Sequence, residues 1–147
     1  MEQTPSASFS LLSVRFPRFS FSSDLGADDQ AKYELGFVVQ GAYNPESAEA
    51  IVYMVVKVGQ QPEAEPEAEA EDLTEVHCTA VFQLEQGTLI ETIPEHFYNN
   101  ALGILFPYIR SFISNLTVQA GWPTMMLPLL NVTSLNQSLK ASILEQK

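Results

Sequence analysis

Alternating apolar and polar positions occupy the first half of the chain and predict β-strands. Residues 9–21 alternate on both sides of Pro17, and Leu35–Gln40 and Glu75–Glu85 alternate in the same way. Ile51–Val58 is β-branched and almost continuously apolar. Alternation is typical of a strand with one covered face, and a continuous apolar run is typical of a central strand. We expect these four segments to form an antiparallel meander.

Pro17 indicates where the first strand lies in the sheet. Proline cannot donate a hydrogen bond to a β-ladder, so it is confined to sheet edges and bulges. We therefore expect residues 9–21 to lie at an edge of the sheet, where they can pair with another subunit.

Apolar positions spaced three and four residues apart begin after Pro94 and predict a long helix. Pro94 suits the first helical position, and Gly121 followed by Trp122 and Pro123 suits the end. Pro107 lies inside this helix and predicts a kink rather than a break. One apolar face is enough to cover a sheet, so a second one predicts a further partner surface. The first face holds Phe97, Ala101, Leu105, Ile109, Phe112 and Leu116, and the second holds Tyr98, Leu102, Phe106 and Ile113.

The remaining residues predict a loop and a short helix. Residues 122–132 are apolar and contain two prolines, and Ser134 with Gln137 resembles a capping box. A short C-terminal helix follows, with a thin apolar stripe of Leu135, Leu139 and Ile143. The fold class is therefore α+β, in one domain of residues 1–147: a four-stranded antiparallel sheet, a long kinked helix, an apolar crossover loop and a short C-terminal helix.

Charge is concentrated in one segment. The net charge is −11, yet six of the 18 acidic residues lie between Glu63 and Asp72. Residues 60–72 alternate Glu and Ala around two prolines, which predicts a solvated hairpin loop, with a docking site for a basic partner as the alternative. We also expect residues 1–8 to form a flexible N-terminus. The seven Lys and Arg residues form no cluster, so the sequence does not favour nucleic-acid binding.

Cysteine usage and hydropathy favour a cytoplasmic protein. The single cysteine, Cys78, cannot form an intrachain disulfide. The N-terminus lacks the pattern of a secretory signal, and the longest unbroken apolar run, residues 101–109, is too short to span a bilayer. We expect no direct membrane insertion.

Little in the sequence predicts catalysis. His77 and Cys78 are neighbours on an expected strand, so their side chains point to opposite faces and cannot form a nucleophile–base pair. His96 is expected to be a partly exposed residue at a helix start, and two histidines with one cysteine do not make a zinc site. We expect a non-enzymatic protein without a metal or cofactor.

The apolar crossover loop leaves two interpretations open. Met125, Met126, Leu127, Leu129 and Leu130 are either buried by the same chain or presented to a ligand. Flexible methionines suit surfaces that accept varied shapes. The pattern alone does not decide between core packing and binding.

Short motifs resemble a known family. Gly103–Arg110 (G-I-L-F-P-Y-I-R) resembles the N-I-L-F-P-Y-A-R segment in the first helix of the bacterial export chaperone SecB. Gly121–Pro123 and Leu127–Pro128 resemble the G-x-F-P and L-x-P elements of its crossover loop, and Leu135–Gln146 corresponds to its second helix. Ser20–Ser22 resembles the S-F-E element of its first strand.

The resemblance implies an ATP-independent holdase that binds unfolded or pre-export polypeptides in apolar grooves. It also implies a homotetramer, a dimer of dimers joined through the sheet edge and the long helix. The implied oligomer interface comprises Phe16, Phe19, Leu102, Phe106 and Ile113. The implied client-binding groove comprises Trp122, Met125, Met126, Leu127, Leu129, Leu139 and Ile143.

Two positions depart from the family pattern. SecB engages the export ATPase SecA through acidic residues of the first strand, at positions that align with Arg18 and Ser22. Neither residue is acidic, so the sequence disfavours SecA coupling through this surface. The runner-up hypothesis is a dedicated SecB-like chaperone for one partner, such as an antitoxin. A small-molecule-binding or catalytic domain on the same frame is a third hypothesis.

Overall fold

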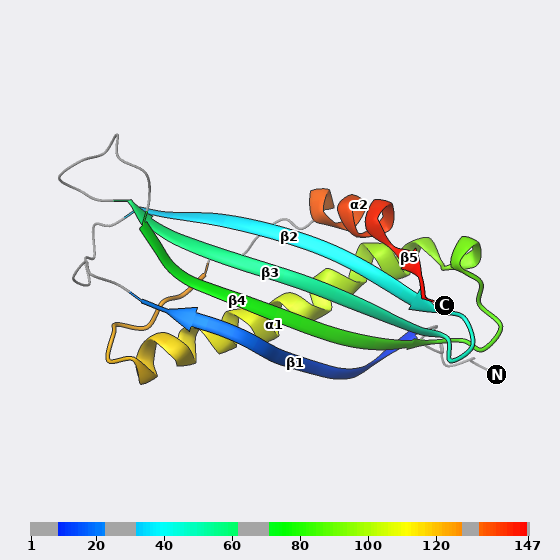
Figure 1. Ribbon diagram of the computed structural model, residues 1–147, viewed down its shortest axis with the longest axis horizontal. Helices are drawn as coiled ribbons and strands as arrows, with labels where there is room; N and C mark the ends of the chain where they lie inside the picture. Colours follow the sequence, from blue (N-terminus) through cyan, green and yellow to red (C-terminus); the bar gives the residue numbers. More distant parts are fainter. Residues whose placement is uncertain (1–8, 23–31, 62–70, 128–132, 147) are drawn as a thin grey trace, which may run out of the picture.

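The computed structural model describes residues 9–22, 32–61, 71–127 and 133–146 and has the expected α+β class (Figure 1). Strands and helices follow one another in the predicted order, with a short strand added at the C-terminal end. The elements are β1 (Phe9–Phe21), β2 (Lys32–Asn44), β3 (Glu49–Gln61), β4 (Glu71–Leu84), the 3-10 turn η1 (Ile90–Thr92), α1 (Glu95–Gln119), α2 (Thr133–Ser142) and β5 (Leu144–Glu145).

The sheet has the order β1-β4-β3-β2-β5, so the expected meander covers only β2, β3 and β4. β1 pairs with β4 and lies at the edge opposite to β2, which corrects the predicted four-stranded meander and confirms the predicted edge position. β4 and β3 lie between β1 and β2, and β4 therefore pairs on both sides.

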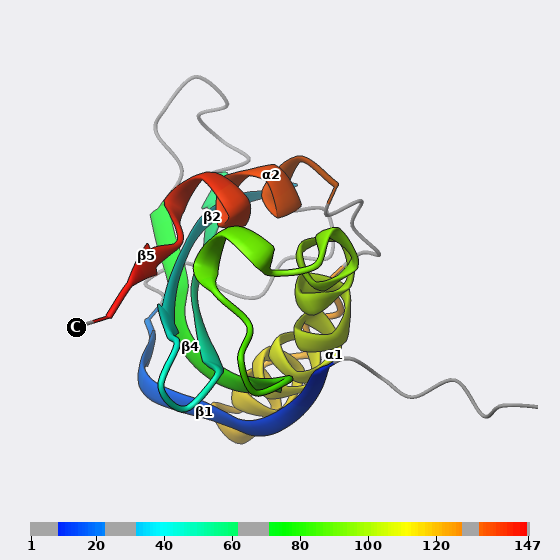
Figure 2. The same cartoon turned by 90° about the vertical axis from the view of Figure 1, so that its right-hand side faces the viewer.

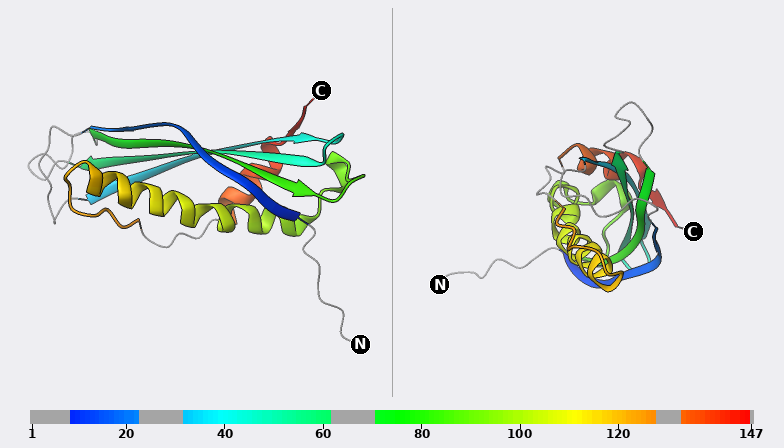
Figure 3. Two further views of the ribbon diagram at one scale, coloured as in Figure 1. Left: turned by 90° about the horizontal axis from the view of Figure 1, so that it is seen from below. Right: turned by 90° about the vertical axis from the view of Figure 1, so that its left-hand side faces the viewer.

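Both helices lie on one face of the sheet, here called the inner face (Figures 2 and 3). Alternate residues of the central strands point to this face and are buried under α1. None of the described helices covers the opposite, outer face. The core residues from β3 and β4 are Val52, Met54, Val56, Val58, Val76, Cys78, Ala80 and Phe82.

The second apolar face of α1 is buried within the chain. Leu102 and Ile113 are 0% exposed and Phe106 is 5% exposed. Within this chain these three residues belong to the core, and their role in an oligomer interface stays a prediction. They are buried because the curved sheet and α2 contact α1 from different sides (Figure 2).

The C-terminal end of α1 matches the prediction, whereas Pro94 is the N-cap residue and not the first helical residue. The helix continues through Pro107 without a break and ends where Gly121 adopts a φ of +82°. The Trp122 amide donates to the Thr117 carbonyl (2.9 Å) and the Gly121 amide donates to Val118 (3.0 Å), which is a Schellman motif. By length and composition alone α1 could also span a membrane. Its nine buried residues pack within the core instead.

The third and fourth strands extend further into the expected acidic loop than predicted. β3 extends to Gln61 and β4 begins at Glu71, so strand pairing occupies both ends of the expected acidic loop at 60–72. Residues 62–70, and the expected flexible residues 1–8, lie outside the described ranges.

The C-terminal helix is shorter than predicted. It begins at Thr133, which places Ser134 inside the helix instead of at its cap, and ends at Ser142. Leu144–Glu145 then pairs in parallel with Ala42–Tyr43, and the Gln146 amide donates to the Tyr43 carbonyl (2.7 Å). The chain leaves the helix because the edge of β2 offers unpaired backbone groups there.

Candidate polypeptide-binding surface

Residues 120–127, here called the crossover segment, run back along α1. Three polar side chains of α1 hold the backbone of this segment. Arg110 Nε donates to the Leu127 carbonyl (3.1 Å), Ser114 Oγ donates to the Met125 carbonyl (2.8 Å), and Thr117 Oγ1 accepts the Met125 amide (3.0 Å). Positions 110, 114 and 117 lie on one helix face. Sequence reasoning missed them, although three polar residues at this spacing in an apolar helix are a usable signal.

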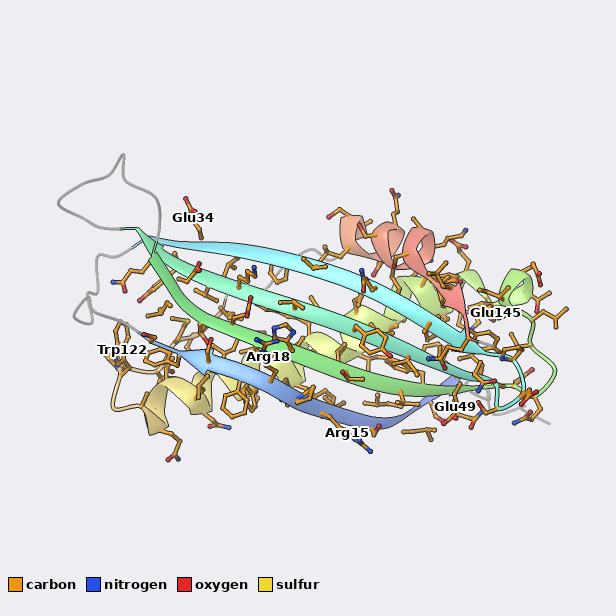
Figure 4. All side chains as sticks on the ribbon, viewed as in Figure 1. Arg15, Arg18, Glu34, Glu49, Trp122 and Glu145 are labelled. Carbon is orange, nitrogen blue, oxygen red and sulfur yellow. The ribbon has the colours of Figure 1, made fainter. Side chains whose placement is uncertain are left out.

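The crossover segment alternates between buried and exposed side chains. Met125 is 7% and Leu127 is 3% exposed, so both are core residues rather than open groove residues. Met126 between them is 70% exposed. Trp122 is half-buried, and its ring lies edge-on at 5.3 Å from Phe21 (Figure 4 labels Trp122). Leu129, the remaining loop residue of the expected groove, lies outside the described ranges.

α2 packs closely on β2. A Cβ placed at Gly41 would lie 3.0 Å from Leu139 and 3.2 Å from Ile143, so glycine permits this approach. Leu139 is 0% exposed and belongs to the core, whereas Ile143 is half-buried. Lys140 pairs with Glu95 of α1 at 2.7 Å, which fixes α2 on its other side.

A row of apolar side chains on β2 remains partly exposed on the inner face. We call Tyr33, Leu35 and Phe37 the β2 strip. Exposure falls along this strand from 43% at Tyr33 to 7% at Val39 and 0% at Tyr43. It falls because α2 packs against Gly41 and does not reach the Tyr33 end. The sequence predicted Leu35 and Phe37 as strand, whereas Tyr33 precedes the predicted strand, and it assigned none of the three to the site.

The β2 strip and the crossover segment border the same stretch of α1. The ring centroid of Phe37 lies 6.2 Å from that of Phe106. Arg110, one helical turn further on, holds the carbonyl of Leu127. Across the strand from Tyr33, Gln60 is 3% exposed, and its Oε1 has no hydrogen-bond partner among the described residues. The surface thus combines apolar side chains with a buried polar group at one end.

The other predicted interface residues lie where β1 meets α1. Phe16 is half-buried and stacks on Phe112 with ring centroids 4.2 Å apart. Phe19 is 51% exposed and meets the same ring edge-on at 5.0 Å. Phe19, Phe21 and Leu116 border an open groove at this edge.

The predicted separation of His77 and Cys78 holds. Cys78 points into the core, where burial raises the pKa of its thiol to about 12. His77 pairs across the sheet with Val55 and Arg18, on the outer face. His96 lies beside Phe9, with ring centroids 5.8 Å apart. In the part of the chain that the structure describes, no three His, Cys, Asp or Glu side chains are grouped to hold a metal ion.

Comparison with known proteins identifies the class of protein to which this fold belongs. The fold matches that of a SecB-like chaperone of Mycobacterium tuberculosis, solved in complex with a ChAD peptide from the HigA1 antitoxin. The TM-score is 0.68 at 18% identity, covering 84% of this chain and 91% of that one. Residues 28–142 also match the family described as preprotein translocase subunit SecB, and the chain belongs to this family of chaperones.

Curated relatives match over a shorter stretch. The protein-export protein SecB of Anaplasma marginale, in strain Florida and in strain St. Maries, is 32% identical over 66 residues. The match spans 45% of this chain and 38% of each relative.

Proposed function

We propose that this protein is an ATP-independent holdase that binds non-native polypeptides in an extended form, without catalysing a reaction. The observation that carries the proposal is the partly exposed β2 strip, together with the exposed Met126 of the crossover segment. Partly exposed Tyr, Phe and Met side chains gain free energy when client side chains remove them from water. The gain is roughly 25 cal/mol per Å² of apolar area, so a few hundred Å² supports several kcal/mol.

The edge of β2 supports binding of an extended chain. Among the described residues, β5 pairs only with Ala42 and Tyr43 on the outer edge of β2. An extended client laid on the rest of this edge would gain backbone hydrogen bonds, and its alternate side chains would face the β2 strip. Backbone pairing is independent of sequence, which suits a chaperone that accepts many clients.

Assembly into a homotetramer, in the cytoplasm, is part of the proposal. β1 is the free edge of the sheet on the other side, and Phe19 is exposed there. The outward face of α1 carries Ile104, Tyr108 and Val118, which are 39%, 49% and 49% exposed. In the single chain these residues, and not Leu102, Phe106 or Ile113, are the exposed helix surface. Light scattering coupled to gel filtration measures the assembly, which Phe19→Glu is expected to weaken.

A dedicated chaperone for one partner is the second candidate function. Arg18 and Ser22 are both exposed, so the two positions that would engage SecA present a cation and a hydroxyl to solvent. The structural neighbour from Mycobacterium tuberculosis was solved with an antitoxin peptide, which gives this alternative a precedent within the fold.

Aggregation of chemically unfolded proteins tests the proposal. Several unrelated, aggregation-prone proteins are diluted from denaturant with and without this protein, and scattered light is followed without nucleotide. A general holdase suppresses scattering for all of them at near-stoichiometric amounts. Suppression for one protein alone supports the dedicated function, and unhindered aggregation of every client contradicts both.

A further inference from the structure

The outer face of the sheet carries two arginines on its β1 edge. In Figure 4, which views this face, Arg15 and Arg18 both lie on β1, with Arg18 beside β4. Residues three apart on a regular strand point to opposite faces. Here the register with β4 shifts between Arg15 and Arg18, so that Arg15 is opposite Thr79 and Arg18 is opposite His77.

This bulge places both guanidinium groups on one face. Thr79 and His77 are two residues apart on β4 and share the outer face, so their partners on β1 share it as well. The bulge contains Pro17, whose missing N–H removes a ladder bond and favours such an irregularity. Same-face neighbours on a strand are about 7 Å apart. The bulge therefore brings the backbone positions of Arg15 and Arg18 close to this spacing.

Neither guanidinium is neutralised by a residue that the structure describes. Lys57 pairs with Glu75 at 3.3 Å, Lys140 pairs with Glu95, and Arg110 donates to a carbonyl. Arg15 and Arg18 are exposed, and no ion pair or hydrogen bond of their side chains occurs among the described residues. In a chain of net charge −11, the two unpaired arginines are thus neighbours on one face.

The nearest carboxylate on this face is already engaged. Hydrogen bonding from His77 and then Lys57 holds the pKa of Glu75 below its ordinary value. His77 Nε2 lies 3.3 Å from Glu75 Oε2, and Lys57 Nζ lies 3.3 Å from Glu75 Oε1. Glu75 therefore stays ionised and satisfied, and offers little to the arginines.

Exposed apolar side chains lie in the same cross-strand rows as the arginines, on strands further from β1. The cross-strand row through Arg18 contains His77, Val55 and Val38, and Val38 on β2 is 53% exposed. The neighbouring row through Arg15 contains Thr79 and Tyr53, and Tyr53 on β3 is 39% exposed. The outer face thus has its two arginines at the β1 edge and its exposed apolar side chains two and three strands away.

We propose that the outer face of the sheet, with Arg15 and Arg18 at its β1 edge, docks an acidic polypeptide segment of a partner protein. Two carboxylates at alternate positions of an extended segment are also about 7 Å apart and match the spacing of the two arginine positions. Arginine suits this role because its planar fork binds a carboxylate through two parallel hydrogen bonds. This docking site does not depend on the holdase activity.

Fluorescence anisotropy with a labelled octapeptide of alternating Glu and Val tests the proposal on the full chain. Matched peptides of alternating Gln and Val, and of alternating Lys and Val, are the controls. We expect the Glu peptide to bind more tightly than both, and salt at about 0.5 M to weaken it because exposed charges are screened. Arg15→Gln and Arg18→Gln should each weaken binding about two- to fivefold, and the double variant more, which is the range of exposed charge pairs.

Matched variants separate this site from general electrostatics and from the β2 strip. Lys140→Gln removes one charge on α2 and should leave binding unchanged. Tyr33→Thr with Met126→Thr alters the inner-face surface and should also leave binding unchanged. Circular dichroism checks the fold of each variant. The proposal is overturned if the Glu peptide does not bind to wild type, or binds equally to wild type and to the double arginine variant. It is also overturned if Lys140→Gln weakens peptide binding as much as the arginine variants do, or if the Tyr33/Met126 variant loses peptide binding.

Discussion

Thr117 is the residue on which the position of the crossover segment depends most directly. Its hydroxyl donates to the Ser114 carbonyl (2.9 Å) and accepts the Met125 amide (3.0 Å), and the side chain is fully buried. A buried amide that loses its acceptor costs about 1–3 kcal/mol, because water cannot replace the lost bond. Met125 and Leu127 are kept in the core by this contact and its neighbours.

Replacing Thr117 with Val is therefore expected to destabilise the protein by about 1–3 kcal/mol. Valine keeps the shape and removes the hydroxyl, whereas Thr117→Ser keeps the hydroxyl and is the matched control. Urea unfolding measures both variants. If Thr117→Val and Thr117→Ser lose the same amount of stability, the hydroxyl does not hold the crossover segment.

Cys78 gives a second prediction at the residue scale. Burial raises the pKa of its thiol to about 12. Only the thiolate is a nucleophile, so at pH 8 the folded protein holds this cysteine in its unreactive, protonated form. We expect a thiol reagent to label it slowly in buffer and rapidly in denaturant. Fast labelling of the folded protein at pH 8 would show that Cys78 is accessible and not part of the core.

At the scale of elements, Gly41 determines how closely α2 approaches the sheet. A Cβ at this position would lie 3.0 Å from Leu139 Cδ1, closer than ordinary packing allows. The Lys140–Glu95 pair and the hydrogen bond from Asn136 to the Asn99 carbonyl tie α2 to α1 on its other side. The helix therefore has little freedom to move away from an added methyl group.

Gly41→Ala is expected to cost about 1–3 kcal/mol through overpacking. Leu139→Ala on its own should also destabilise, because it leaves a cavity in the core. In combination the two changes should cost less than the sum of the single effects, since the smaller side chain makes room for the new Cβ. Additive effects in the double-mutant cycle would indicate that Gly41 and Leu139 are not in contact.

The sequence predicted the secondary-structure elements better than it predicted which strands pair with one another. Residues 9–21 form β1 with the expected bounds, because Pro17 and the apolar alternation are local signals. The pairing of β1 with β4 depends on contacts between distant segments, which periodicity does not encode. For the same reason β5 was missed, since a two-residue strand exists only through the edge of β2.

The site was predicted only in part. Met126 was expected at a binding surface and is exposed, but its neighbours Met125 and Leu127 are core residues. A stretch of apolar residues does not say which ones alternate inward until the segment is placed along α1. The β2 strip was hidden for a similar reason, because α2 covers one end of β2 and leaves the Tyr33 end open.

The whole molecule has two faces of different chemistry. The inner face carries the helices (Figure 3) and, at its open end, the apolar β2 strip. The outer face carries the two arginines at its β1 edge and exposed apolar side chains on β3 and β2. The acidic net charge of −11 favours solubility of a molecule that exposes apolar surface. A protein built in this way can hold a client on one face and leave the other free for a partner.

Binding of a permanently unfolded polypeptide to matched variants tests the central claim most directly. A labelled protein that is reduced and carboxymethylated, so that it cannot refold, is titrated with wild type, with the double variant Tyr33→Thr and Met126→Thr, and with Leu89→Thr. Leu89 is 53% exposed before η1, away from the β2 strip, and is the control for losing an exposed apolar side chain. The double variant is predicted to bind at least about tenfold more weakly, since each lost contact is worth about 1.5 kcal/mol or more, while Leu89→Thr binds like wild type. Equal affinities for all three proteins would contradict the assignment of the β2 strip as the client-binding surface.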